Sequence, residues 1–287
     1  MFSKYFGNFL LNKGIITSQQ LNEVFQEEKN THVKLGILAL NKGFMTLQQI
    51  EEVNEAQMSS DKRFGEIAID KGYLSIDKLE ELLTGQKSSY LLLSQILLDK
   101  NILTMAQISK HLFNYKNENG LTNEDLQELT SDNVEKIISS SLQLKNSTFE
   151  EYLVLLAKNI ERHLHEKTFV EKVNEDLIND YPLIAFQKIT GEYNLDTYLM
   201  LKESDFIKIA SIFAEEVITE VDDLCISAIL EFLNLHNGIF VVNEVDKGFD
   251  IDLEVQCMAE ITTLRDEMSY FKFTFADMSI VVGLKKN

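Results

Sequence analysis

The stretch that decides the fold is DDLCISAILEFLNLHNG, residues 222–238. Its apolar side chains recur at the three- and four-residue spacing of a helix that buries one face. Glu231 and Asn234 stand three positions apart, so a carboxylate and a carboxamide are neighbours on that helix. Ser227 lies close to the same stripe. We expect the helix to end at Gly238, in a left-handed conformation.

An E-x-x-N pair is by itself a weak indicator of function. The same spacing occurs at Glu51/Asn54 and at Glu171/Asn174. A polar edge on an amphipathic helix is the simplest explanation of such a pair. Its meaning therefore depends on the rest of the chain.

The charge distribution indicates two domains, which a chain of 287 residues can accommodate. The whole chain has 27 basic and 46 acidic residues, but residues 1–117 hold 13 of each kind. The net charge of −19 therefore falls entirely after residue 117. This acidic part disfavours nucleic acid or an anionic membrane as a partner.

The sequence suggests a cytoplasmic protein without a metal site of its own. The first residues, MFSKYFGNFLLNKG, lack the apolar core and the cleavage site of a signal peptide. We expect no stretch to be apolar over the length that crosses a bilayer. Cys225 and Cys257 are expected to be reduced, and His163 and His165 face different sides of a predicted helix, which disfavours a metal pair.

Four copies of one 29-residue unit make up the first 115 residues. In each copy a short helix ends at a glycine or asparagine, and a threonine or serine begins a second helix. One such unit cannot bury its apolar face alone, so we expect the four to stack into an all-α array over residues 1–117. The residues in register are Gly7, Gly36, Gly65 and Ser94, then Gly14, Gly43, Gly72 and Asn101, then Thr17, Thr46, Ser75 and Thr104.

The repeats resemble the MshEN domain of type II secretion and pilus assembly ATPases, whose motif begins with R-L-G and ends with L-x-x-Q. Copy three has Arg63-Phe64-Gly65 and copy two has Lys34-Leu35-Gly36, while copies one and four lack the arginine and the glutamine. Some members of that family bind cyclic di-GMP, and the resemblance implies a set of nucleotide-binding residues. They are Lys34, Gly36, Gly43, Gln57, Arg63, Gly65, Gly72 and Gln86.

An alternative is open for the repeats. Lysine lacks the planar fork of donors that arginine offers, and only one of the four copies keeps the arginine. The array would then serve packing and the docking of a partner. Beyond it, residues 118–146 are predicted to be a helical linker, with segments that begin near Asn123 and near residues 131–133.

Residues 147–287 are predicted to form an α/β (α+β) domain, an antiparallel sheet covered by helices. Thr148 and Glu151 make a capping box that begins a long helix ending near His165. A second helix is expected from Ser204 to about Glu220. Strands are expected at 183–189, 194–201, 239–243, 251–258, 270–275 and 278–282.

This order of elements, with E-x-x-N-x-x-x-G in the central helix, resembles the CheX family of response-regulator phosphatases, relatives of CheC and FliY. The matching residues are Glu231, Asn234 and Gly238. The family often has an acidic residue near Ser227 and a proline in the strand around residues 256–260, and this chain has neither. The resemblance implies a Mg²⁺ ion that belongs to the partner. A homodimer through this domain is a further expectation.

The resemblance also implies a function. Glu231 would pair with a lysine of a CheY-like receiver, and Asn234 would place a water in line with its aspartyl phosphate, with Ser227 and Gly238 as partner contacts. Phosphoryl transfer depends mainly on placing the nucleophile, so no cofactor of its own is required. The alternative is a non-catalytic adaptor that docks receivers or binds cyclic di-GMP in a chemotaxis, pilus or secretion pathway. Burial of Glu231 and Asn234 would exclude the phosphatase.

Overall fold

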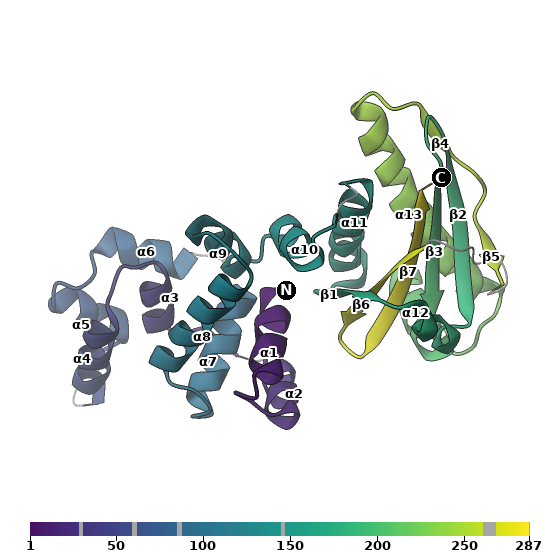
Figure 1. Cartoon of the computed structure of the whole chain (residues 1–287). Helices are drawn as coiled ribbons and strands as arrows, with labels where there is room; N and C mark the ends of the chain where they lie inside the picture. Colours follow the sequence, from purple (N-terminus) through teal and green to yellow (C-terminus); the bar gives the residue numbers. More distant parts are fainter. Residues whose placement is uncertain (29–30, 59–61, 85–87, 145–146, 261–267, 287) are drawn as a thin grey trace. The chain divides into compact units, whose positions relative to one another are not determined.

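The computed structural model describes residues 1–28, 31–58, 62–84, 88–144, 147–260 and 268–286. The chain divides into two compact units, Met1–Asn133 and Val134–Asn287 (Figure 1). Of the two helical segments expected in the linker, α9 (Asn123–Thr130) belongs to the first unit and α10 (Val134–Leu142) to the second. A linker 118–146 between domains 1–117 and 147–287 stays a prediction.

In the first unit, each copy of the repeat forms two short helices. Gly14, Gly43 and Gly72 have φ of 67°, 68° and 72°, and Asn101 has 52°, so all four end a helix in the left-handed region as predicted. The helices are α1 (Phe2–Asn12), α2 (Ser18–Glu27), α3 (Leu35–Asn41), α4 (Leu47–Met58), α5 (Phe64–Asp70), α6 (Ile76–Thr84), α7 (Ser89–Asp99) and α8 (Met105–Glu118).

The copies pair in a nested order. Helices α1 and α2 of the first copy pack on α7 of the fourth, and α3 and α4 of the second pack on α5 of the third. The aromatic rings of Phe2, Phe6 and Tyr115 join the outer pair. In the inner pair a Cβ on Gly36 would lie 3.1 Å from the Phe64 ring, so the motif glycine allows two helices to approach closely.

The second unit has a seven-stranded sheet among its described residues, in the order β1-β6-β7-β3-β2-β4, with β5 also paired to β2. All of these pairs are antiparallel, as expected. Strand β1 was not predicted from the sequence. The strands are β1 (Phe169–Val173), β2 (Leu183–Gly191), β3 (Leu195–Leu201), β4 (Ile251–Leu253), β5 (Cys257–Ala259), β6 (Ser269–Phe275) and β7 (Met278–Lys286).

Different elements pack on the two faces of this sheet. Ile184 and Met200 pack with Ile178 of a short 3-10 helix, η1 (Glu175–Asp180). Alternate residues face the other way because side chains of a strand alternate between the faces. That second face carries α13, which lies against β2 (Figure 1). Besides α10, η1 and α13, the described residues of the unit form the helices α11 (Ser147–Leu164) and α12 (Glu203–Ala214).

The central helix corrects the sequence analysis. Helix α13 runs without a break over Asp223–Asp246, so Gly238 does not end it and no strand forms at 239–243. The run of β-branched residues after Gly238 suggested a strand, but the helix continues because Phe240 is buried in the core. The predicted strand 251–258 is interrupted between β4 and β5, and α12 ends at Ala214, earlier than expected.

Helix α13 is also long and apolar enough, by length and composition alone, to cross a membrane. The expectation that no stretch reaches this length is therefore wrong. Its side chains Phe232, Leu233 and Phe240 are buried inside the unit. This burial is what a helix at the centre of a globular core requires.

A buried histidine of α13 predicts acid sensitivity. The His236 ring is fully buried, its Nδ1 lies 3.0 Å from Asn159 Nδ2, and burial lowers its pKa from 6.5 to about 3. Between these two pKa values, His236 binds a proton in the unfolded chain and stays neutral in the folded chain, so the unfolding free energy falls as the pH falls. From pH 7 to pH 5, the wild type should lose about 2 kcal/mol more unfolding free energy than His236→Leu. An equal loss of unfolding free energy between pH 7 and pH 5 in the two proteins, measured by denaturation, would contradict this.

Candidate functional site

The outer face of α13 presents the polar residues that the sequence singled out. Glu231 and Ser227 are exposed, and Asn234 and Gly238 are half-buried. Among the described residues, the Glu231 carboxylate makes no hydrogen bond or ion pair. Both members of the pair therefore reach the surface, and the carboxylate is available to a cation from outside.

The Asn234 side chain is anchored to the sheet below it. Its Oδ1 accepts a hydrogen bond of 2.9 Å from Gln187 Nε2 of β2. The same Nε2 donates to the main-chain oxygen of Glu254, also at 2.9 Å, in the segment between β4 and β5. The Gln187 side chain thus connects the candidate site with an exposed loop.

A chain of buried polar groups continues inward from Gln187. Its Oε1 accepts from Asn237 Nδ2 at 2.9 Å, and Asn237 Oδ1 accepts from the Tyr152 hydroxyl at 2.7 Å. Asn237 also donates to Thr197 Oγ1. Burial raises the pKa of the Tyr152 hydroxyl, which keeps it protonated as a donor. The carboxamide at the surface is the outer end of a satisfied network.

Exposed apolar side chains flank the polar pair on the same helix. Leu224 is 46% exposed near one end of α13, and Val242 and Val245 are 59% and 48% exposed near the other. A Cβ on Gly238 would meet no atom within 4 Å, so the glycine leaves a bare strip of helix surface between them. Exposed apolar residues gathered on one face of a helix are typical of a surface that docks another protein.

The residues that hold Asn234 in place were not predicted from the sequence. Gln187 lies in the predicted strand 183–189 and Asn237 in the predicted helix that ends at Gly238, and neither was given a role. A weak indication was present in the alternation of β2, where Ala185, Gln187 and Ile189 share one face. A glutamine between two buried apolar neighbours needs a polar partner, but the sequence alone does not say which one.

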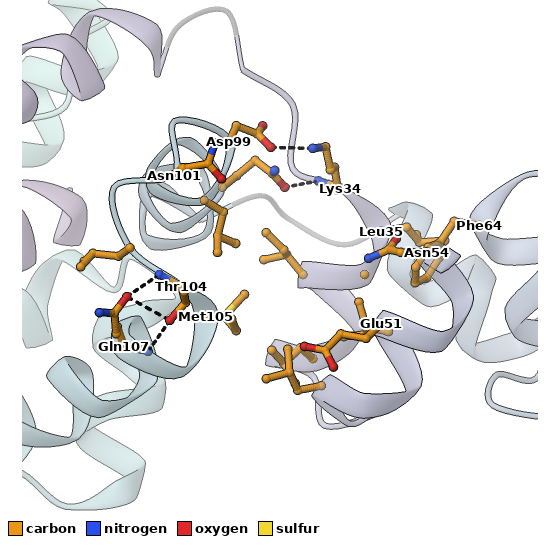
Figure 2. A pocket seen from close by; sticks show the side chains of 18 of the residues that line it. Lys34, Leu35, Glu51, Asn54, Phe64, Asp99, Asn101, Thr104, Met105 and Gln107 are labelled. Atoms are coloured by element: carbon orange, nitrogen blue, oxygen red, sulfur yellow. Dashed lines mark hydrogen bonds and ion pairs between the residues drawn. The ribbon is translucent and has the colours of Figure 1, made fainter. Parts of the chain in front are cut away.

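The first unit has a cavity of about 580 Å³ between its second and fourth copies (Figure 2). Lys34 lies at its edge, where its Nζ pairs with Asp99 at 2.5 Å and its main-chain N–H donates to Gln95 at 3.0 Å. Among the described residues, the charged side chains that line this cavity are Lys34, Glu51 and Asp99. This part of the lining carries a net negative charge.

The structure does not bring the predicted nucleotide-binding residues together in this cavity. Lys34, Gly36 and Gln57 line it, and Gly43 lines a second one of about 650 Å³. Neither lining includes Gly65, Gly72 or the exposed Arg63, whose main-chain N–H donates to Glu66. Gln86 lies outside the described residues.

Cyclic di-GMP is expected to bind the full chain weakly or not at all. The nucleotide carries two phosphate charges, whereas the cavity beside Lys34 has two carboxylates and one lysine that is already paired. Calorimetric titration checks this. Any binding that occurs should disappear in Arg63→Ala, because only arginine offers the bidentate fork. Tight binding that survives Arg63→Ala would contradict a site inferred from the motif.

Within the described ranges, no group of three or more metal-ligating side chains comes together. At the candidate site, Asn234 contributes a carboxamide and Glu231 one carboxylate.

Comparisons with known proteins give matches at the level of structure. No protein-family model and no curated protein matches the sequence. The chemotaxis protein CheX of Vibrio vulnificus is similar over 50% of this chain and 100% of its own, with 14% identity and a TM-score of 0.43. A chain of the CheX–CheY–BeF3–Mg²⁺ complex of Borrelia burgdorferi is similar over 49% and 97%, with 15% identity and a TM-score of 0.42. FliY of Thermotoga maritima follows, over 45% and 80%, at 13% identity and a TM-score of 0.35. Half of this chain is thus similar to chemotaxis proteins of the CheX type.

Proposed function

We propose that the second unit dephosphorylates the aspartyl phosphate of a CheY-like receiver domain. The observation that carries the proposal is the placement of Glu231 and Asn234 on the outer face of α13, with Asn234 anchored from below by Gln187. A carboxylate free to bind a cation stands one helical turn from a carboxamide of fixed position. This is the arrangement that the motif requires.

Each residue has a distinct role in this proposal. The Glu231 carboxylate binds a lysine of the receiver and fixes the register of docking. Asn234 enters the acidic pocket of the receiver, where a neutral carboxamide is not repelled by the phosphoryl group. There it orients the attacking water, which is a contribution of placement and not of new covalent chemistry. The receiver brings the Mg²⁺ ion and its own lysine.

The flanking residues suit the docking step. Leu224, Val242 and Val245 are exposed on both sides of the pair, and they offer apolar area that a receiver surface can cover. Ser227 and Gly238 add little bulk between them, so the helix can lie close to the partner. The first unit would regulate or localise the enzyme.

Charge reversal at Glu231 tests the docking role. In Glu231→Lys a cation faces the receiver lysine, so the receiver concentration at half-maximal rate should rise about tenfold or more. The rate is measured as loss of phosphate from a panel of phosphorylated receivers. Asp176→Lys is the control, because this exposed residue of η1 lies on the opposite side of the sheet and changes the net charge equally. Equal effects of both substitutions would point to long-range charge alone.

The same assay separates the phosphatase from the adaptor. An adaptor would bind receivers and leave the lifetime of their aspartyl phosphate unchanged. Binding measured without acceleration, across the whole panel and with Mg²⁺ present, would reject the catalytic proposal. Acceleration by the wild type that is lost in Asn234 variants would support it.

A further inference from the structure

Gln187 is an unusual residue for the centre of a sheet. Its side chain is only 1% exposed, on the face of β2 that α13 covers. Both hydrogens of its amide group are used, one by Asn234 Oδ1 and one by the Glu254 carbonyl. Its own oxygen accepts from Asn237. A buried carboxamide with these three partners has one orientation, because turning it over would place its oxygen against two acceptors and its nitrogen against a donor.

Two main-chain carbonyls determine which side-chain atom donates and which accepts in each hydrogen bond of this network. A carbonyl oxygen can only accept, so the bond to Glu254 O requires the nitrogen of Gln187 at that position. On the inner side, the Thr197 hydroxyl donates its hydrogen to the main-chain oxygen of Gln187 at 2.6 Å. The hydroxyl oxygen can then only accept in its bond with Asn237 Nδ2. Both anchors turn the oxygen of Gln187 toward Asn237 and its nitrogen toward Asn234.

These hydrogen bonds fix the orientation of the Asn234 amide at the surface. Because Gln187 Nε2 donates a hydrogen to Asn234, Asn234 accepts it with Oδ1, and its Nδ2 points away from the sheet. Turning the Asn234 amide over would place two NH₂ groups against each other. The surface carboxamide therefore presents its donor hydrogens outward in a fixed way, with one lone pair of Oδ1 left for a water.

We propose that Gln187 is a positioning residue for the dephosphorylation, one that holds Asn234 with its amino group toward the phosphoryl oxygens of the docked receiver. This inference rests on the proposed function. It adds that the Asn234 amino group donates to the phosphoryl oxygens while the remaining lone pair of Oδ1 is left for the attacking water, and that this orientation is built into the free protein. An exposed asparagine without such an anchor would divide its time between two amide orientations.

The test uses two variants of the full chain. Gln187→Met keeps the length of the side chain and removes both donors. Gln187→Glu places a carboxylate opposite Asn234 Oδ1, so Asn234 should turn its amino group inward. Each variant should lower the maximal dephosphorylation rate about tenfold to a hundredfold. The receiver concentration at half-maximal rate should change less than about twofold, because the docking surface is intact.

The control is Ser279→Ala, which removes the buried hydrogen bond from the Ser279 hydroxyl to Asp205 in the same unit without touching Asn234. It should lower thermal stability and leave the maximal rate of the folded protein within about twofold. A similar rate loss in this variant would show that the Gln187 effects follow from general destabilisation, and it would overturn the proposal.

A second measurement does not need activity. Nitrogen-15 relaxation should show the Asn234 Nδ2 group as ordered as the backbone in the wild type and as mobile as that of exposed Asn243 in Gln187→Met. An Asn234 amide that is mobile in the wild type, or unchanged in Gln187→Met, would overturn the positioning role. If no receiver is dephosphorylated by the wild type, the proposed function fails, while this measurement still decides whether Gln187 orders Asn234.

Discussion

Asn234→Ala is expected to abolish nearly all stimulated dephosphorylation, with a fall of about a hundredfold or more in the maximal rate. The carboxamide is the group that would orient the attacking water, and alanine offers neither a donor nor an acceptor. Docking depends on Glu231 and on the apolar residues around it, so the receiver should still bind. Single-turnover loss of phosphate from a saturated receiver measures the rate directly.

The matched control is Asn243→Ala, which removes an exposed asparagine from the same helix nine residues further on. Its dephosphorylation rate should equal that of the wild type. Asn234 is half-buried and, among the described residues, its side chain bonds through Oδ1 to Gln187. Its loss leaves one hydrogen of the buried Gln187 amide without a partner, so the variant should lose about 1–3 kcal/mol of unfolding free energy and still fold. Full activity of folded Asn234→Ala would reject the mechanism, whatever the affinity for the receiver.

The elements that the sequence predicted best are those in which local and tertiary preferences agree. The β2–β3 hairpin follows from two β-rich runs around Gly191, and the helix ends in the repeats follow from Gly14, Gly43 and Gly72. The continuation of α13 past Gly238 could not be predicted, because tertiary packing decides it: Phe240 is buried, and its ring contacts Tyr152 of α11. The nested pairing of the repeats depends on contacts between distant copies that no local pattern encodes.

In the candidate site, too, some residues could be predicted from the sequence and others could not. Glu231 and Asn234 are visible in the sequence because helical spacing makes them neighbours. Gln187 and Asn237 come from different elements, 50 positions apart, and only the folded register places their amides 2.9 Å from each other. The polar groups that reach the surface thus follow from one helix, whereas their orientation depends on the sheet beneath it.

Asn237→Ala should be among the most destabilising single substitutions in the second unit, at about 3–5 kcal/mol of unfolding free energy. Asn237 is fully buried and makes three hydrogen bonds, so its removal leaves the Tyr152 hydroxyl and the Gln187 oxygen without their partners. Each orphaned buried group costs about 1–3 kcal/mol. Urea denaturation followed by circular dichroism measures the loss, and Asn243→Ala should stay within about 0.5 kcal/mol of the wild type.

Asn237→Asp distinguishes lost hydrogen bonds from lost volume. Aspartate has nearly the same shape and still accepts from Tyr152, but its second oxygen would face the oxygens of Gln187 and Thr197. Burial and these oxygens favour the protonated acid, so the folded pKa of the new carboxyl is raised above its unfolded value. Its cost relative to the wild type should therefore shrink as the pH falls toward that unfolded pKa. A penalty equal to that of Asn237→Ala at every pH would mean that the direction of the hydrogen bonds is unimportant, and the orientation of Asn234 would then need another cause.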